Sequence, residues 1–115
     1  MQEKKNYSTS RQYYRIRYPL SYHPKVRIQG EDYEGDVIEL SERGVRFSCD
    51  DKIILSEGSD LAVNITFHDG ESFELKGEIL RVTDEDVIVR FVDWLPLIRI
   101  MKEQIYLRNN FVGHM

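Results

Sequence analysis

Two arginines near the start of the chain have the type and spacing to bind a compact anion. Arg11 and Arg15 stand four positions apart, with Gln-Tyr-Tyr between them. A guanidinium group donates two parallel hydrogen bonds to a phosphate, and its flat face stacks on a purine. In an extended or loosely turned segment, both groups can close around one small anion. Taken alone, such a pair more often belongs to a solvated charged segment.

A second group of residues lies at a turn further along the chain. The stretch Glu39-Leu-Ser-Glu-Arg-Gly44 separates two segments in which apolar and polar residues alternate. Glu39 and Ser41 have the same parity, so both side chains point to one face of a regular strand. The carboxylate can accept hydrogen bonds from a guanine edge, and the Ser41 hydroxyl can contact a phosphate or a base. Gly44 permits either a positive φ or a close backbone approach. By itself, the group also fits an ordinary strand-to-strand turn.

The other polar residues predict neither catalysis nor a metal site. The three histidines are scattered, and the sequence has no metal-ligand spacing, nucleophile elbow or glycine-rich phosphate loop. The acidic groups at 50–51 and 84–86 fall where turns are expected, so we interpret them as solvated turn charges. Cys49 is the one cysteine, which excludes an internal disulfide, and it is expected to be a small buried residue at a strand end.

Six segments with a period of two are expected to form antiparallel strands. They cover residues 25–29, 33–40, 45–49, 61–67, 73–80 and 87–92. Turn signals separate them, and the Asp69-Gly70 pair is typical of a tight hairpin. A change of phase at Ile79-Leu80 indicates a bulge or corner near Gly77. Because so many short strands hide their apolar faces only by closing or stacking, the pattern predicts a small all-β barrel or sandwich.

The end of the chain changes to a helical period. Pro96 suits the first turn of a helix, and an amphipathic helix is predicted over residues 96–110. Its apolar stripe is expected to pack on the barrel or on a partner. The stripe consists of Leu97, Ile98, Met101 and Ile105, and the other face carries Arg99, Lys102, Glu103 and Arg108.

Charge is unevenly distributed along the chain. Residues 1–29 contain seven basic and one acidic residue, whereas the other 86 residues contain nine basic and 19 acidic ones, and the net charge is −4. The acidic body argues against a role in coating long nucleic acid, while the basic head can clamp a small anion or simply fold onto the acidic body. The chain has no apolar run long enough to cross a membrane and no apolar signal segment. We therefore expect a cytoplasmic protein without membrane insertion.

Taken together, the two motifs resemble the PilZ domain family of receptors for cyclic di-GMP (c-di-GMP). The resemblance rests on Arg11-Gln-Tyr-Tyr-Arg15 followed by Glu39-Leu-Ser-Glu-Arg-Gly44, and it extends over residues 11–110. It implies a six-stranded antiparallel β-barrel with a C-terminal helix, no catalysis, and binding of a bacterial second messenger as a ligand without a cofactor. The expected organisation is a flexible lead (1–10), an arm (11–22), a barrel (23–93), a helix (96–110) and a tail (111–115).

The resemblance also implies roles for five residues. Arg11 and Arg15 would contact the phosphates and stack on guanine, Glu39 would accept from the guanine edge, and Ser41 and Gly44 would complete the floor of the site. The family pattern has Asp or Asn where this chain has Glu39. The extra methylene displaces the acceptor by about one C–C bond and adds rotamer freedom that is lost on binding. We expect the contact to persist with altered geometry or affinity.

Three functional hypotheses follow from the sequence. The leading one is a c-di-GMP receptor that orders its N-terminal arm on binding and signals to an unidentified protein partner; residues 1–18 would then lack a packed place on the barrel beforehand. The second is a PilZ-like adaptor that no longer binds the nucleotide. The third, a small nucleic-acid-binding barrel, is opposed by the acidic body. Homodimer formation through the helix or the barrel edges, and one or two ligands per site, stay open.

Overall fold

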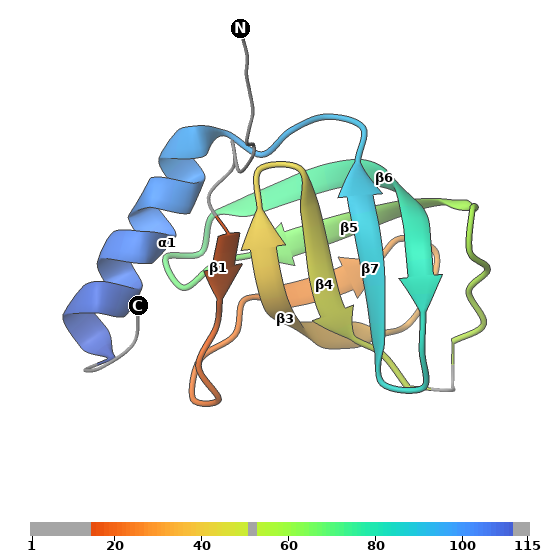
Figure 1. Cartoon of the computed structure of the whole chain (residues 1–115), viewed down its shortest axis with the longest axis horizontal. Coiled ribbons are helices and arrows are strands. Elements are labelled where there is room, and N and C mark those ends of the chain that lie inside the picture. Colours follow the sequence, from red (N-terminus) through yellow and green to blue (C-terminus); the bar gives the residue numbers. More distant parts are fainter. Residues whose placement is uncertain (1–14, 51–52, 112–115) are drawn as a thin grey trace, which may run out of the picture.

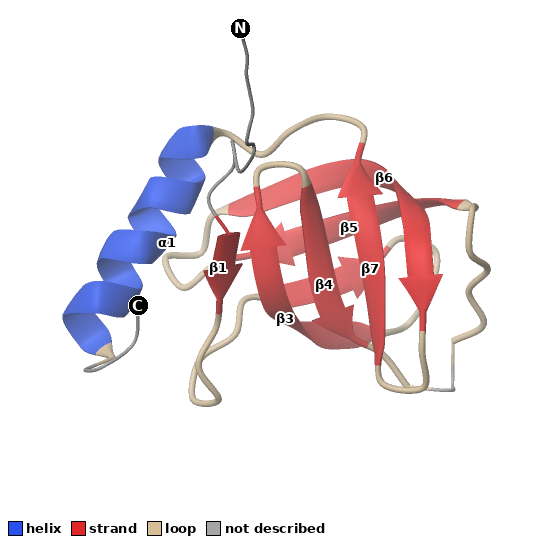
Figure 2. Cartoon of the chain, viewed as in Figure 1, coloured by secondary structure: helices blue, strands red, loops and turns tan. Residues whose placement is uncertain are grey.

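The computed structural model describes residues 15–50 and 53–111. In this part of the chain it has seven strands and one helix, with the helix beside a curved sheet (Figures 1 and 2). The elements are β1 (Arg15–Arg17), β2 (Lys25–Ile28), β3 (Glu34–Ser41), β4 (Gly44–Ser48), β5 (Asp60–Thr66), β6 (Ser72–Val82), β7 (Asp86–Phe91) and α1 (Leu97–Asn110). Among the described residues, no helix is long and apolar enough to span a membrane.

Six of the strands close into a barrel. All neighbouring pairs are antiparallel, and the order β2-β3-β4-β7-β6-β5 returns to its start through the pairing of β2 with β5. The predicted six-stranded antiparallel barrel with a C-terminal helix is therefore confirmed. Closure pairs the edges that an open sheet of this size would leave exposed.

The core follows from the period-two alternation of the strands. Most inward positions of the strands carry aliphatic or aromatic side chains, and most outward positions are polar. Cys49 is buried immediately after β4, as predicted, and this burial raises the pKa of its thiol. The Asp69-Gly70 turn forms with Gly70 at a φ of 86°. The central buried side chains include Val26, Val37, Phe47, Val63, Ile65, Ile79, Val87 and Val89.

The irregularity predicted near Gly77 lies in β6 at the predicted change of phase. The register between β6 and β7 shifts between Ile79 and Arg81, so Leu80 forms the bulge, three residues after Gly77. Ile79 is buried, whereas Leu80 is about half exposed on the outer surface. The bulge thus turns an apolar side chain outward, which becomes relevant to the pocket described below.

The N-terminal segment departs from the prediction. Residues 15–17 form β1, which pairs with the end of β3, and Ile16 and Tyr18 are buried in the core. The expectation that residues 1–18 lack a packed place on the barrel is therefore wrong for residues 15–18. The reason is the short alternation Arg15-Ile-Arg-Tyr18, which directs two apolar side chains inward. Arg11 and the rest of residues 1–14 lie outside the described residues.

The helix also packs differently from the prediction. Its buried residues are Arg99, Ile100, Glu103 and Leu107, whereas Leu97, Ile98, Met101 and Ile105 are exposed. Packing of the apolar stripe on the barrel, one of the two expected outcomes, is therefore wrong. Arg99 and Glu103 face the barrel because the β5–β6 turn and the segment after β1 supply polar partners for them.

Candidate ligand-binding site

Most of the predicted site residues meet at one pocket on the outer face of the barrel. The pocket has a volume of about 300 Å³ and lies where β1, β3, β4, β7 and β6 come together. Arg15, Glu39, Ser41 and Gly44 all line it. Arg11 lies outside the described residues. The other lining residues are Leu40, Arg43, Val45, Arg46, Leu80, Ile88, Val89 and Arg90.

Strand pairing explains how the two sequence motifs come together. In the β1–β3 ladder, Arg15 pairs with Ser41 and Arg17 with Glu39. In the β3–β4 ladder, Glu39 pairs with Arg46 and Ser41 with Gly44. Directly paired residues on adjacent strands lie side by side. The short strand β1 therefore brings Arg15, the last residue of the first motif, beside the second motif, although Arg15 and Glu39 are more than 20 positions apart in the chain.

The Glu39 carboxylate is held by two guanidinium groups. Its Oε2 accepts hydrogen bonds from Arg17 at 3.2 Å (Nε) and 3.0 Å (Nη2). Its Oε1 lies 3.9 Å from Arg46 Nη1. Because the Arg17 side chain is 72% exposed, this ion pair contributes little to stability, on the order of 0–1 kcal/mol. A ligand group with two donors can therefore compete for the carboxylate.

The turn that carries Ser41 and Gly44 is tightly fixed. The Ser41 Oγ accepts a hydrogen bond of 3.2 Å from the backbone N–H of Arg43. A Cβ at Gly44 would lie 2.7 Å from the carbonyl oxygen of Val89, so this position requires glycine for a close backbone approach. Of the two explanations open at the sequence level, close approach applies, since the φ of Gly44 is not positive.

Three further arginines line the pocket and are not among the predicted site residues. Arg43 lies in the turn, with its guanidinium 4.6 Å above the Trp94 ring. The Arg46 Nε donates to Asp86 at 2.8 Å, and the Arg90 Nη2 donates to Glu78 at 2.8 Å. Arg46 and Arg90 occupy outward positions of strands in which apolar and polar residues alternate. This alternation was the signal in the sequence that could have pointed to them. The pairing of β4 with β7 that brings them to one pocket could not be deduced from the alternation.

Asp86 orients Arg46, so the prediction that Asp86 is a solvated turn charge is wrong. Its side chain is 14% exposed and also accepts a 2.8 Å hydrogen bond from the Thr83 hydroxyl. Burial alone would raise the pKa of the Asp86 carboxyl, but hydrogen bonds from Arg46 and Thr83 outweigh burial and lower it. Asp86 therefore stays ionised and keeps Arg46 at the pocket wall.

The chemistry of the pocket suits an anionic ligand that also has flat apolar parts. Arginines surround it, Glu39 offers a carboxylate as hydrogen-bond acceptor, and Leu80 and Ile88 provide apolar surface. In the described part of the chain, no group of three or more His, Cys, Asp or Glu side chains could hold a metal ion.

Comparison with known proteins identifies the family. The sequence model of the PilZ domain family matches residues 9–101 of this chain. The chain belongs to the PilZ domain family, whose members are non-enzymatic receptors and adaptors of the c-di-GMP type. No curated protein sequence matches the chain closely enough to count as a relative.

Solved structures with the same fold include two relevant examples. The Bacillus subtilis inhibitor of motility (MotI/DgrA) is 16% identical with a TM-score of 0.68, and the match covers 88% of this chain and 54% of that one. The PilZ domain of Escherichia coli YcgR, solved with c-di-GMP, is 17% identical with a TM-score of 0.61, and the match covers 83% and 87%. The chain thus spans about half the length of the Bacillus structure. At these identities, the likeness demonstrates the fold.

Proposed function

We propose that this chain is a c-di-GMP receptor that signals to another protein. The observation that carries the proposal is the convergence of Arg15, Glu39, Ser41 and Gly44 on one arginine-lined pocket. The solved YcgR PilZ domain, which has the same fold, contains c-di-GMP. The ligand is a dianion with two guanine bases, and it matches both the cationic wall and the apolar surface of the pocket.

Each pocket residue has a role that follows from its chemistry. Arg15 is exposed at the pocket edge and donates to a ligand phosphate or stacks on a base. Arg11 adds a second guanidinium from the segment before β1. Glu39 accepts from the guanine edge, which requires its carboxylate to exchange Arg17 for the ligand. The Ser41 hydroxyl and the close backbone at Gly44 form the floor.

The signal to a partner passes through the turn between β3 and β4. The backbone N–H of Phe91 donates to the carbonyl of Arg43 at 2.7 Å, and the N–H of Leu95 donates to Glu42 at 2.8 Å. These bonds fasten the turn to the segment that leads into α1. A ligand that contacts the turn therefore changes the surface near the start of the helix, where a partner can read it. The hypothesis that the N-terminal arm is ordered on ligand binding now applies only to the residues that precede β1 in the sequence.

Calorimetry separates this function from the two alternatives. The full chain is titrated with c-di-GMP and then with a single-stranded oligonucleotide. We expect saturable binding of c-di-GMP and none of the oligonucleotide. Absence of c-di-GMP binding would favour an adaptor that works through protein contacts alone, and preferential binding of the oligonucleotide would favour a nucleic-acid-binding barrel.

The adaptor without nucleotide binding has one specific observation in its favour. Glu39 stands where the family pattern has Asp or Asn, and its carboxylate is engaged by Arg17 and Arg46. If these ion pairs are permanent, the guanine edge has no acceptor. In that case the pocket would be a structural ion-pair network on the barrel surface.

A further inference from the structure

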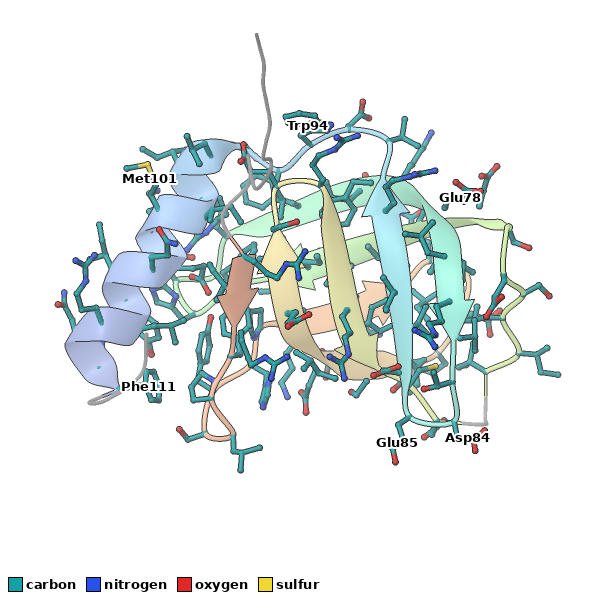
Figure 3. All side chains as sticks on the ribbon, viewed as in Figure 1. Glu78, Asp84, Glu85, Trp94, Met101 and Phe111 are labelled. Atoms are coloured by element: carbon teal, nitrogen blue, oxygen red, sulfur yellow. The ribbon has the colours of Figure 1, made fainter. Side chains whose placement is uncertain are left out.

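The helix α1 is amphipathic, but it presents its apolar side to solvent. Leu97, Ile98, Met101 and Ile105 are between 42% and 62% exposed. At roughly 100° per residue, these four positions fall within about 100° of the helix circumference, which makes them one continuous stripe. We call these four residues the outer stripe. Figure 3 shows Met101 on the side of the helix that faces away from the barrel.

A buried acid fixes this orientation from the inner side of the helix. Glu103 is fully buried, and its Oε1 accepts hydrogen bonds from the hydroxyls of Tyr18 at 2.9 Å and Tyr22 at 3.0 Å. Its Oε2 accepts from Arg99 at 2.8 Å and lies 2.9 Å from Nδ1 of His68. Burial and the nearby Glu103 carboxylate raise the pKa of Tyr18, which therefore stays a hydroxyl donor.

A buried base completes the inner contact. Arg99 is 1% exposed, and its Nη1 donates to Asp69 at 2.9 Å and to Glu71 at 2.6 Å in the β5–β6 turn. Its guanidinium also lies 4.3 Å above the Phe67 ring. Breaking a buried ion pair leaves uncompensated charge and is strongly destabilising. The helix therefore cannot turn its outer stripe inward, and the stripe stays available on the surface.

Two more exposed apolar residues precede the stripe. Val92 is 69% exposed and Trp94 is 48% exposed, both in the segment between β7 and α1. Trp94 stacks under Arg43 of the pocket. Large contiguous apolar patches on a protein surface mark interaction sites, and the outer stripe of α1 is the candidate for such a site here.

The charges beside the outer stripe indicate what it binds. Along α1 the exposed charged residues are Lys102 and Arg108, both basic, whereas Glu103, the acidic residue of this helix, is buried. Amphipathic helices commonly dock by laying an apolar face against a complementary one. We propose that the outer stripe binds an amphipathic helix of a partner protein that carries acidic residues beside its own apolar face. This docking does not depend on c-di-GMP binding.

Charge also argues against two other occupants. An antiparallel second copy centred on Met101 would bring the two Lys102 side chains to the same side of the pair, near its twofold axis. Binding to an anionic membrane surface takes a cluster of about four to eight basic residues, whereas the helix exposes two.

Two designed peptides as long as α1 test the proposal with the full chain. Both have a leucine stripe; one carries glutamates beside it and the other carries lysines. We expect the acidic peptide to bind, to shift the amide signals of α1, and to lose about tenfold or more in affinity with Met101→Glu or Ile105→Glu. Leu20→Glu, at an exposed apolar position outside the helix, is the matched control and should leave binding unchanged.

The same experiment tests the role of the two basic residues beside the outer stripe and the competing occupants of the stripe. The double variant Lys102→Glu/Arg108→Glu should reverse the preference and bind the basic peptide more tightly. The proposal is overturned if neither peptide binds, or if both bind equally. It is also overturned if sedimentation shows self-association that Met101→Glu abolishes, or if the chain binds vesicles of phosphatidylglycerol through the outer stripe.

Discussion

At the scale of single residues, Glu39 is the site residue at which this chain departs from the PilZ pattern described in the sequence. Its carboxylate contacts Arg17 on β1 and Arg46 on β4, the two strands that flank β3 at this level. Sequence parity predicted correctly that Glu39 and Ser41 line the same side of β3. It could not predict Arg17 as a partner, because that contact requires β1, which was interpreted as part of a flexible arm.

Substitution of Glu39 tests its role as the guanine acceptor. Glu39→Asp restores the shorter side chain of the family pattern, so c-di-GMP affinity should be preserved or increased. Glu39→Gln should weaken binding, because the acceptor loses its charge and an amide N–H₂ can face the guanine donors instead. Calorimetry of the two variants measures this. Wild-type affinity in Glu39→Gln would mean that the carboxylate does not contact the ligand.

At the scale of elements, β1 and α1 are the parts that the sequence predicted incompletely. The six barrel strands follow from the sustained alternation of apolar and polar residues. The helix follows from apolar residues that recur every four positions. The three residues of β1 are too few for periodicity to stand out, although Ile16 and Tyr18 are both buried. The inward direction of Arg99 and Glu103 depends on partners from distant segments, which amphipathic patterning cannot reveal.

The packing of β1 predicts protection in the absence of ligand. The N–H of Tyr18 donates to the carbonyl of Ile38 at 3.0 Å, and Ile16 is 1% exposed. Amide exchange at Tyr18 should therefore be slow in the free protein. Ile16→Ala should destabilise the fold by about 2–5 kcal/mol through loss of a buried side chain. Rapid exchange at Tyr18 without ligand would show instead that the segment orders only on binding.

The attachment of α1 predicts a dependence of stability on pH. Hydrogen bonds from Arg99, together with a backbone bond from Glu71, lower the pKa of the Asp69 carboxyl from its ordinary value of 3.8. A pKa that is lower in the folded state stabilises the fold above pH 3.8, and this contribution is lost as the pH falls through the lower folded value. Asp69→Asn should flatten the acid side of the stability curve.

Chemical denaturation at a series of pH values measures this effect. Asp60→Asn is a suitable control, since Asp60 is an exposed residue at the start of β5, away from the helix. The control should keep the wild-type acid dependence. An unchanged acid limb in Asp69→Asn would indicate that the Arg99 ion pair to this carboxylate does not contribute to stability.

At the scale of the whole molecule, the arginines of the pocket stand on a chain with a net charge of −4. The sequence predicted the basic head and the acidic body, and the structure adds arginines from β4, β7 and the β3–β4 turn to the same pocket. These residues belong to the acidic body, so a count of charges along the chain does not locate them. Barrel closure brings them beside Arg15.

This arrangement predicts that ligand affinity depends on salt. Guanidinium–phosphate contacts at a partly exposed pocket are screened within about 10 Å at 0.1 M salt. The affinity for c-di-GMP should therefore fall steadily as salt is raised. Titrations at increasing concentrations of sodium chloride measure the slope. A flat profile would exclude a major contribution of arginine–phosphate contacts.

The most direct test of the account is the effect of Arg15→Ala on c-di-GMP affinity. A charge-assisted hydrogen bond contributes about 1.5–3 kcal/mol, and about 1.4 kcal/mol corresponds to a tenfold change. Arg15→Ala, and likewise Arg11→Ala, should weaken binding by more than about tenfold. Arg27→Ala, an exposed arginine on β2 outside the pocket, should bind as the wild type does. Wild-type affinity in both Arg11→Ala and Arg15→Ala would contradict the assignment of the pocket.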